Sequence, residues 1–237
     1  MLTGENLSRN FGGLMAVSNA SFHVNEGEIV GLIGPNGAGK TTLFNLISGA
    51  IKPVSGKITF KGENITPLKP HQICRKGIAR TFQSANLFNG MTVLENVRLA
   101  LLFGKAERLP ESEVRRQALQ LLATVNLLAE RSKLVKDLPI GSQKRVEIAR
   151  ALATRPELLL LDEVMAGLNP TELTQSIELI GRIRDQGITV FMIEHIMQAI
   201  MTVCDRIIVF HNGSNLVEGT PGEVANHPTV IRIYLGE

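Results

Sequence analysis

Hydrophobic and polar residues alternate in some parts of the chain and form unbroken apolar runs in others. Alternating or β-rich runs fall within residues 1–33 and 57–60 and predict an N-terminal, largely antiparallel portion. The unbroken runs lie in residues 28–34, 157–163 and 188–195. Each is as long as one strand, is apolar on both faces and is followed by a helical pattern. We therefore expect three buried parallel strands of an α/β sheet.

Local signals mark two further elements. Residues 40–49 place their apolar side chains on one helical face and end in Gly49, which is typical of a helix terminus. Near the other end of the chain, residues 207–219 contain Asn212-Gly213 between two apolar stretches. This dipeptide predicts the tight turn of a β-hairpin.

The middle of the chain has a different pattern. Strand signals disappear between residues 84 and 150, where helices are predicted at 92–104 and 112–128. A helical insertion into an α/β core accounts for this most simply. We expect a single domain in which residues 1–83 and 151–237 form the core and residues 84–150 form a helical subdomain.

Composition narrows the possible classes. Of 237 residues, 44% are hydrophobic and 20% are charged, as in a soluble globular protein with an ample core. No apolar run approaches the ~18 residues that span a bilayer, and the N-terminal residues lack the pattern of a secretory signal. Cys74 and Cys204 suggest neither a disulfide framework nor a metal site, and a net charge of +3 does not favour nucleic acid. We expect a cytoplasmic protein that reaches a membrane only through a partner.

The most specific motif is GPNGAGKT at residues 34–41, which fits GxxxxGK[ST] in full between a strand and a helix. Backbone N–H groups of such a loop surround phosphate oxygens. Lys40 would reach the β- and γ-phosphates, and the Thr41 hydroxyl would bind Mg²⁺. The alternative is a chance glycine-rich turn. The predicted nucleotide-binding residues are Gly34, Pro35, Asn36, Gly37, Ala38, Gly39, Lys40, Thr41 and Thr42.

Two later strands end in polar residues. Asp162 ends one apolar run and suits a partner for hydrated Mg²⁺, while Glu163 could orient and polarise an attacking water. His195 ends another run, where α/β sheets place ligand residues, and is a candidate γ-phosphate contact. The alternative for Asp162 and Glu163 is that they are two acidic residues at a strand end exposed to solvent. The alternative for His195 is a purely structural role.

Together these residues resemble the nucleotide-binding subunit of an ABC transporter over essentially the whole chain. The resemblance implies a P-loop NTPase cassette with an N-terminal antiparallel β portion, a RecA-like parallel-sheet core and an inserted helical subdomain. It implies that Phe11 stacks on adenine, with Val17 as a further candidate contact. It also implies that Gln83 contacts Mg²⁺ or the attacking water, and that residues 167–170 form the D-loop.

The stretch LPIGSQKRVEIARAL, residues 138–152, resembles the family's signature sequence and its helix. In that family the helix N-terminus faces the γ-phosphate of ATP held by the opposite subunit, which implies Gly141, Ser142 and Gln143 as nucleotide contacts. Pro139 stands where the family usually has a serine, and Ile140 and Ser142 replace the usual glycine and glutamine. We expect Pro139 at the first helical position, where proline is well tolerated.

Finer likeness points to one group of these ATPases. RTFQ at residues 80–83, AGLNP at 166–170 and the tail at 219–237 resemble the ATP-binding subunits of branched-chain amino-acid importers. Urea and amide importers share this pattern. The resemblance implies ATP and Mg²⁺ as ligands, and a second ATP-binding subunit, identical or paralogous, as a partner. It also implies membrane permeases that receive the chain on the inner face of the cell membrane, and indirectly a solute-binding protein.

Three other functions fit the sequence less well. A soluble ABC ATPase acting on nucleic acid or ribosomes usually carries two cassettes or extra basic elements, and this chain shows neither. A small-molecule kinase would leave His195 and the signature helix unexplained. A module that only binds ATP has no need of Glu163. The sequence therefore favours an ATPase that powers transport.

Overall fold

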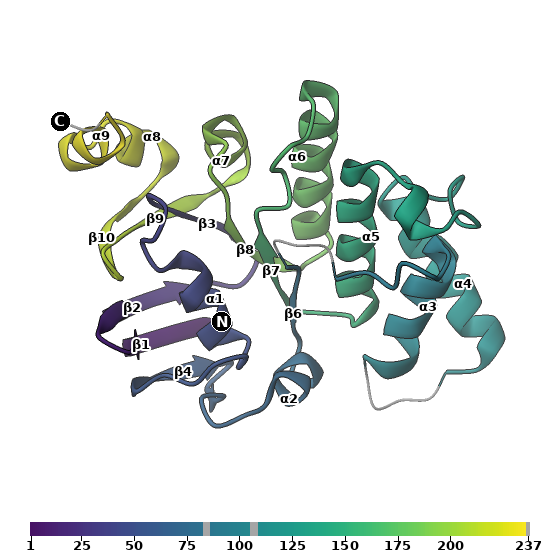
Figure 1. Ribbon diagram of the computed structural model, residues 1–237, viewed down its shortest axis with the longest axis horizontal. Coiled ribbons are helices and arrows are strands. Elements are labelled where there is room, and N and C mark those ends of the chain that lie inside the picture. Colours follow the sequence, from purple (N-terminus) through teal and green to yellow (C-terminus); the bar gives the residue numbers. More distant parts are fainter. Residues whose placement is uncertain (83–85, 105–108, 236–237) are drawn as a thin grey trace.

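A six-stranded, mostly parallel sheet forms the centre of the computed structural model, which describes residues 1–82, 86–104 and 109–235 (Figure 1). Its strand order is β10-β9-β3-β8-β7-β6, in which only β10 runs antiparallel to its neighbour. Parallel strands separated by helices give the α/β core that the apolar runs predict. The strands are β3 (Ile29–Ile33), β6 (Ile78–Arg80), β7 (Leu158–Asp162), β8 (Thr189–Ile193), β9 (Arg206–His211) and β10 (Ser214–Gly219).

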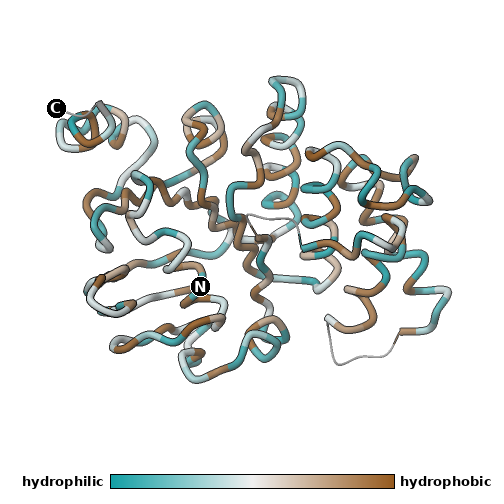
Figure 2. Tube along the Cα trace, in the orientation of Figure 1, coloured by the Kyte–Doolittle hydropathy of each residue, from teal (hydrophilic) through white to brown (hydrophobic). Residues whose placement is uncertain are grey.

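The three predicted buried strands are confirmed, because every residue of β3, β7 and β8 is buried. Alternate side chains of one strand enter different hydrophobic clusters. In β7, Leu159 and Leu161 pack with the helices on one face, whereas Leu158 and Leu160 pack with α1 and the antiparallel strands on the other. Burial on both faces explains the unbroken apolar runs, and Figure 2 shows hydrophobic residues along these central strands.

A second, antiparallel sheet has the order β2-β1-β4-β5. Its strands are β1 (Leu2–Phe11), β2 (Leu14–Val24), β4 (Ser55–Phe60) and β5 (Glu63–Asn64). The predicted antiparallel portion is confirmed, but its expected extension to residue 33 is wrong, because residues 29–33 form β3 of the core sheet. That strand pairs in parallel with β8 and β9, so the chain changes sheets after Val24.

Helices cover the core and form the predicted insertion. The helix α5 ends at Ala153, beyond the expected subdomain boundary at residue 150, so that boundary divides a single helix. The helices near the core are α1 (Lys40–Ile47), α2 (Pro70–Arg75), α6 (Pro170–Asp185), α7 (Met197–Val203), α8 (Pro221–Ala225) and α9 (Pro228–Leu235). The insertion contains α3 (Val93–Phe103), α4 (Glu111–Thr124), the short 3₁₀ helix η1 (Val135–Asp137) and α5 (Ile140–Ala153).

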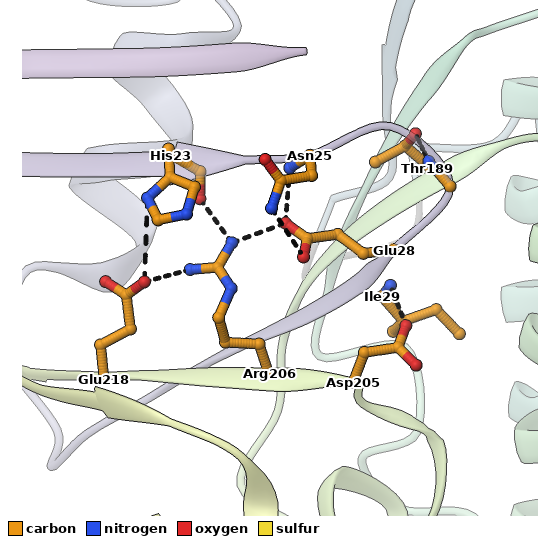
Figure 3. A network of polar contacts seen from close by, with 9 residues as sticks. His23, Asn25, Glu28, Ile29, Thr189, Asp205, Arg206 and Glu218 are labelled. Atoms are coloured by element: carbon orange, nitrogen blue, oxygen red, sulfur yellow. Dashed lines mark hydrogen bonds and ion pairs between the residues drawn. The ribbon is translucent and has the colours of Figure 1, made fainter.

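Arg206 joins the two sheets at the amino end of β9 (Figure 3). Its Nη2 donates to the carbonyl oxygen of His23 at 2.8 Å and to Glu28 Oε1 at 2.5 Å, and its Nη1 donates to Glu218. These partners come from β2, the segment before β3, and β10. The network lies at the edge of the core sheet opposite the carboxyl ends of the parallel strands.

The hairpin prediction is also confirmed. Asn212 and Gly213 connect β9 to β10, with φ angles of 48° and 80°. Two successive residues with positive φ are what a tight hairpin turn with the right-handed twist of the strands requires.

Candidate functional site

The loop between β3 and α1 is pressed against the neighbouring strands. A Cβ on Gly34 would lie 2.0 Å from the carbonyl oxygen of Phe210, and one on Gly39 would lie 2.2 Å from that of Ala16. Both glycines have positive φ, at 153° and 100°. Glycine is therefore required at both positions by backbone conformation and by space.

The loop ends at an open helix N-terminus. Gly39 is the N-cap of α1, and no side chain caps this end. Among the described residues, no acceptor pairs with the backbone N–H groups of Gly39, Lys40 and Thr41. Unpaired amides together with the helix dipole form an anion site, which suits phosphate oxygens.

Lys40 is held across this loop. Its Nζ donates to the carbonyl oxygens of Gly34 at 2.6 Å and Pro35 at 2.9 Å. Burial lowers the pKa of Lys40, and the nearby carboxylates of Glu163 and Asp162 oppose that shift. The structure thus brings the cation of the loop close to the two acidic residues that follow β7.

Asp162 ends β7 with its side chain almost completely buried, at 1% exposure. Its Oδ2 accepts a hydrogen bond from Arg80 Nη2 at 2.8 Å, and its backbone N–H donates to Thr81 Oγ1 at 3.1 Å. Burial raises the pKa of Asp162, whereas the contact with Arg80 lowers it. Asp162 Oδ1 is buried and has no partner among the described residues. An unpaired carboxylate oxygen beside the phosphate loop fits a hydrated Mg²⁺ ion.

Arg80 was not identified from the sequence as a site residue. This arginine ends the short strand β6 and lies 82 positions before Asp162 in the chain. The sequence offered one signal for this role, namely an arginine directly after apolar residues. A buried arginine requires an anionic partner, so this position could have indicated a paired carboxylate.

Glu163 follows Asp162 with a φ of 50°, in the left-handed region that residues other than glycine rarely adopt. Its N–H donates to the carbonyl oxygen of Ile193 at 2.9 Å, and its own carbonyl accepts from Lys144 Nζ at 2.9 Å. Lys144 also donates to the carbonyl oxygen of Ala166 at 2.6 Å. These contacts hold the backbone at Glu163 in a strained conformation, which is common at functional sites.

The other predicted site residues differ in exposure. His195 is exposed, two residues beyond the end of β8. Phe11 is 47% exposed at the end of β1, with the guanidinium of Arg9 5.0 Å from its ring centroid. Val17, the further candidate contact, is fully buried in the core, so its side chain offers no exposed surface to adenine. Gln83 lies outside the described residues.

The signature stretch begins α5, but not as predicted. Pro139 is the N-cap of the helix and Ile140 is its first residue, so the expectation that Pro139 takes the first helical position is wrong. The reason is that the backbone of Pro139 is extended, with ψ at 154°, and its carbonyl oxygen accepts from the N–H of Gln143 at 3.0 Å. Ser142 is partly exposed.

Gly141 is buried against the next helix, where an added Cβ would meet Glu172 Oε1 of α6 at 2.7 Å. Gln143 Nε2 donates to the carbonyl oxygen of Leu138 at 2.9 Å. In the part of the chain that the structure describes, no hydrogen bond or ion pair joins residues 138–143 to residues 34–41. The N-terminus of α5 therefore does not complete the phosphate site of its own chain.

Comparison with known proteins decides the family. A model described as "ABC transporter" matches residues 17–166, and one described as "Branched-chain amino acid ATP-binding cassette transporter" matches residues 215–237. A relative from Salmonella typhimurium, the high-affinity branched-chain amino acid transport ATP-binding protein LivG, is 44% identical over 100% of this chain and 98% of its own length. The chain belongs to the ABC transporter ATP-binding family.

Within that family the cassette belongs to the branched-chain amino-acid group, and its ATP hydrolysis is coupled to transport. Two solved structures resemble it. A nucleotide-free ATP-binding cassette from an ABC transporter has a TM-score of 0.90 and 33% identity, covering 100% of this chain and 99% of that one. A dimeric bacterial ABC transporter cassette has a TM-score of 0.86 and 28% identity, covering 93% of this chain and 99% of that one.

Beside the nucleotide site, the cassette has a cavity of about 350 Å³ between the core and the helical insertion. Glu147 of α5 lines it and is only 6% exposed. Glu147 Oε1 accepts from the N–H of Asn86 at 2.9 Å, and Arg150 donates to the carbonyl oxygen of Asn86. Burial raises the pKa of Glu147 to about 7.

Protonation of Glu147 should make the stability of the cassette depend on pH. Because its pKa is about 7 in the fold and about 4.5 in the unfolded chain, the folded state binds more protons between these values. The free energy of unfolding should then fall by roughly 3 kcal/mol as pH rises from about 4.5 to about 7. Glu147→Gln should remove this dependence, since the amide oxygen can still accept from Asn86.

Denaturant unfolding of wild type and Glu147→Gln at several pH values measures this difference. Glu178→Gln, a change at an exposed glutamate of α6, is the control and should keep the wild-type dependence. Parallel pH profiles for wild type and Glu147→Gln would show that Glu147 does not titrate in this range.

Proposed function

We propose that this cassette hydrolyses ATP with Mg²⁺ in a dimer and powers import of branched-chain amino acids through separate permease subunits. The observation that carries the proposal is the open N-terminus of α1 beside Lys40, Asp162 and Glu163. This arrangement supplies donors for phosphates, an acceptor for a hydrated cation and a carboxylate for water.

The residues around the phosphate loop have separate roles in this proposal. The loop amides and Lys40 would bind the phosphates, and Glu163 would orient and polarise the attacking water. Thr41 and Asp162 would hold Mg²⁺, which when bound screens the charge of the phosphates. His195 would contact the γ-phosphate. Gln83 keeps its role on the sequence resemblance alone.

The signature helix supports a dimer. Its N-terminus makes no polar contact with its own phosphate loop among the described residues, and a second subunit would supply the ATP that it faces. The solved cassette that is described as dimeric supports the same arrangement. The second subunit is either another copy of this chain or a paralogous ATPase.

Pro139 should weaken this dimer, because proline offers the opposite phosphate neither a hydroxyl nor an N–H group. Pro139→Ser would add one hydrogen bond to a charged group and should tighten ATP-driven dimerisation by roughly ten- to a hundredfold. At the N-cap the new hydroxyl can also accept from its own helix, so the isolated subunit should gain about 1 kcal/mol of stability. Its affinity for nucleotide should stay the same.

Sedimentation and nucleotide titration of wild type and Pro139→Ser measure the two affinities. Pro139→Ala, which adds an N–H group but no hydroxyl, is the control and should dimerise less tightly than Pro139→Ser. In a heterodimer, only the site on the partner should gain. Equal changes in nucleotide affinity and in dimerisation would show that the stretch acts within its own chain.

The cavity between core and insertion is the proposed receptor for a permease helix. Its lining includes Phe82 and Asn86, and the sequence resemblance to ABC transporters implies that the stretch at residues 84–93 receives a cytoplasmic helix of the permeases. Phe82 and Phe88 are 43% and 45% exposed, so apolar surface is available to a partner. No helix in the described ranges is long and apolar enough to cross a membrane. We propose that the cassette acts at the inner face of the membrane, bound to its permeases.

Reconstitution tests the proposed function. The cassette, its permeases and a solute-binding protein are placed in proteoliposomes, and phosphate release is measured without any other acceptor. Leucine-loaded binding protein should stimulate hydrolysis and leucine uptake together. Stimulation by urea or an amide, with none by leucine, would move the cassette to the alternative importer class. Phosphate release that needs an added acceptor would contradict the ATPase assignment.

A further inference from the structure

Arg80 contacts two elements of the nucleotide site, the helix α1 and the end of β7. Its guanidinium is buried, with 6% of the side chain exposed, and its Nη2 donates to Asp162 Oδ2 at 2.8 Å. Its Nη1 donates to Asn45 Oδ1 at 2.7 Å and to Ser48 Oγ at 3.1 Å. Asn45 and Ser48 lie at the far end of the helix that begins with Lys40. One planar group therefore links the phosphate-loop helix to the end of β7.

We propose that Arg80 is a positioning residue for the Mg²⁺ ion of bound ATP, because it fixes the rotation of the Asp162 carboxylate and leaves Oδ1 as the oxygen for the hydrated ion. The inference rests on the proposed function, since it concerns the same nucleotide site. It names a residue that neither the motif nor the strand pattern assigns to the ion.

The orientation of Asp162 depends on this contact. Both carboxylate oxygens are enclosed, yet only Oδ2 has a partner among the described residues, and that partner is Arg80. The backbone N–H of Asp162 is occupied by Thr81 Oγ1, so the main chain at this residue is also fixed. Without Arg80 the side chain would be a buried carboxylate with no partner, free to rotate or to bind a proton.

The guanidinium is itself fixed. Its Cζ lies 5.8 Å from the ring centroid of Phe44 and 5.1 Å from that of Phe82. A planar fork can bond Asp162 with one nitrogen and α1 with the other, whereas a lysine ammonium is a single point of charge. Arginine should therefore be needed for geometry as well as for charge.

Arg80→Met tests the proposal by a Mg²⁺ titration. Binding of a fluorescent, non-hydrolysable ATP analogue to the isolated cassette is measured without divalent ions and over a series of Mg²⁺ concentrations. In Arg80→Met, affinity without Mg²⁺ should equal that of wild type, while the Mg²⁺ concentration for half-maximal tightening should rise about ten- to a hundredfold. Arg80→Lys should lie between the two.

Arg206→Met is the matched control. It removes a largely buried arginine with two carboxylate partners, but at the opposite edge of the sheet (Figure 3). Its Mg²⁺ titration should superimpose on that of wild type. Circular dichroism and thermal melting show which variants are folded.

Two results would overturn the inference. One is a wild-type Mg²⁺ curve in Arg80→Met, and the other is an equal loss of affinity with and without Mg²⁺, which marks a purely structural residue. If Arg80→Met does not fold, Asn45→Ala replaces it, since this change removes one of the two partners of Nη1, leaves Ser48 as the other, and keeps the pair with Asp162. It should raise the Mg²⁺ requirement by a few-fold, and no change would equally exclude the proposal. A wild-type cassette that does not bind the analogue would instead contradict the proposed function.

Discussion

In a Glu163→Gln cassette, ATP hydrolysis should fall by about a thousandfold while ATP still binds. The amide keeps the size of the side chain and its capacity for hydrogen bonds, but it cannot polarise water as a carboxylate does. Because the two subunits of the dimer should separate only after hydrolysis, a dimer closed on ATP should accumulate in the variant. The strained backbone at Glu163, held by Lys144 and Ile193, should persist in the variant, since both contacts are made to main-chain atoms of residue 163.

Sizing with ATP and Mg²⁺, together with phosphate release, measures both parts of this result. Glu157→Gln is a matched control at the other end of the same strand, where Glu157 pairs with Lys61 at 2.6 Å. That control should hydrolyse ATP at the wild-type rate. A Glu163→Gln protein that stays monomeric and hydrolyses normally would remove Glu163 from the mechanism.

Lys40→Ala should lower turnover by on the order of a hundredfold or more. The ammonium lies across the loop, where it donates hydrogen bonds to the carbonyl oxygens of Gly34 and Pro35. In the proposed function it would bind the β- and γ-phosphates. Its removal takes away a charge that should matter most as negative charge develops on the transferred group. It also removes from Asp162 one of the nearby cations that lower the pKa of its carboxyl group.

Steady-state phosphate release and nucleotide titration separate the effects on turnover and on binding. Lys61→Ala, a change at an exposed lysine, serves as the control and should leave both unchanged. Turnover of Lys40→Ala within a few-fold of wild type would mean that the nucleotide site has been assigned to the wrong loop.

Local patterns predicted much of the fold. The central strands were identifiable because burial on both faces leaves runs of apolar residues, as at residues 190–193 of β8. The phosphate loop was identifiable because close packing and positive φ allow only glycine at Gly34 and Gly39. By contrast, β6 has three residues and ends in Arg80, so it is too short and too polar for a strand pattern to detect.

The missed residues depend on contacts between distant segments. Glu147 was not identified from the helical pattern, because its partner, the N–H of Asn86, lies 61 positions earlier. Periodicity within one helix carries no information about such a partner. The helix start at Pro139 was misplaced by one residue for a local reason, since proline is favoured at the first turn and its extended ψ cannot be inferred from residue type.

The contacts of Arg206 with three segments also bear on how the protein unfolds. The antiparallel sheet is tied to the core through the carbonyl oxygen of His23, and again through the N–H of Ser18, which donates to Gly213 at 2.8 Å. Opening β2 alone would break these bonds and expose a charged group, so we expect the two sheets to unfold as one cooperative unit. A nucleotide held at the loop after β3 should therefore slow amide exchange in β1 and β2 as well, because those strands are expected to open only with the whole unit.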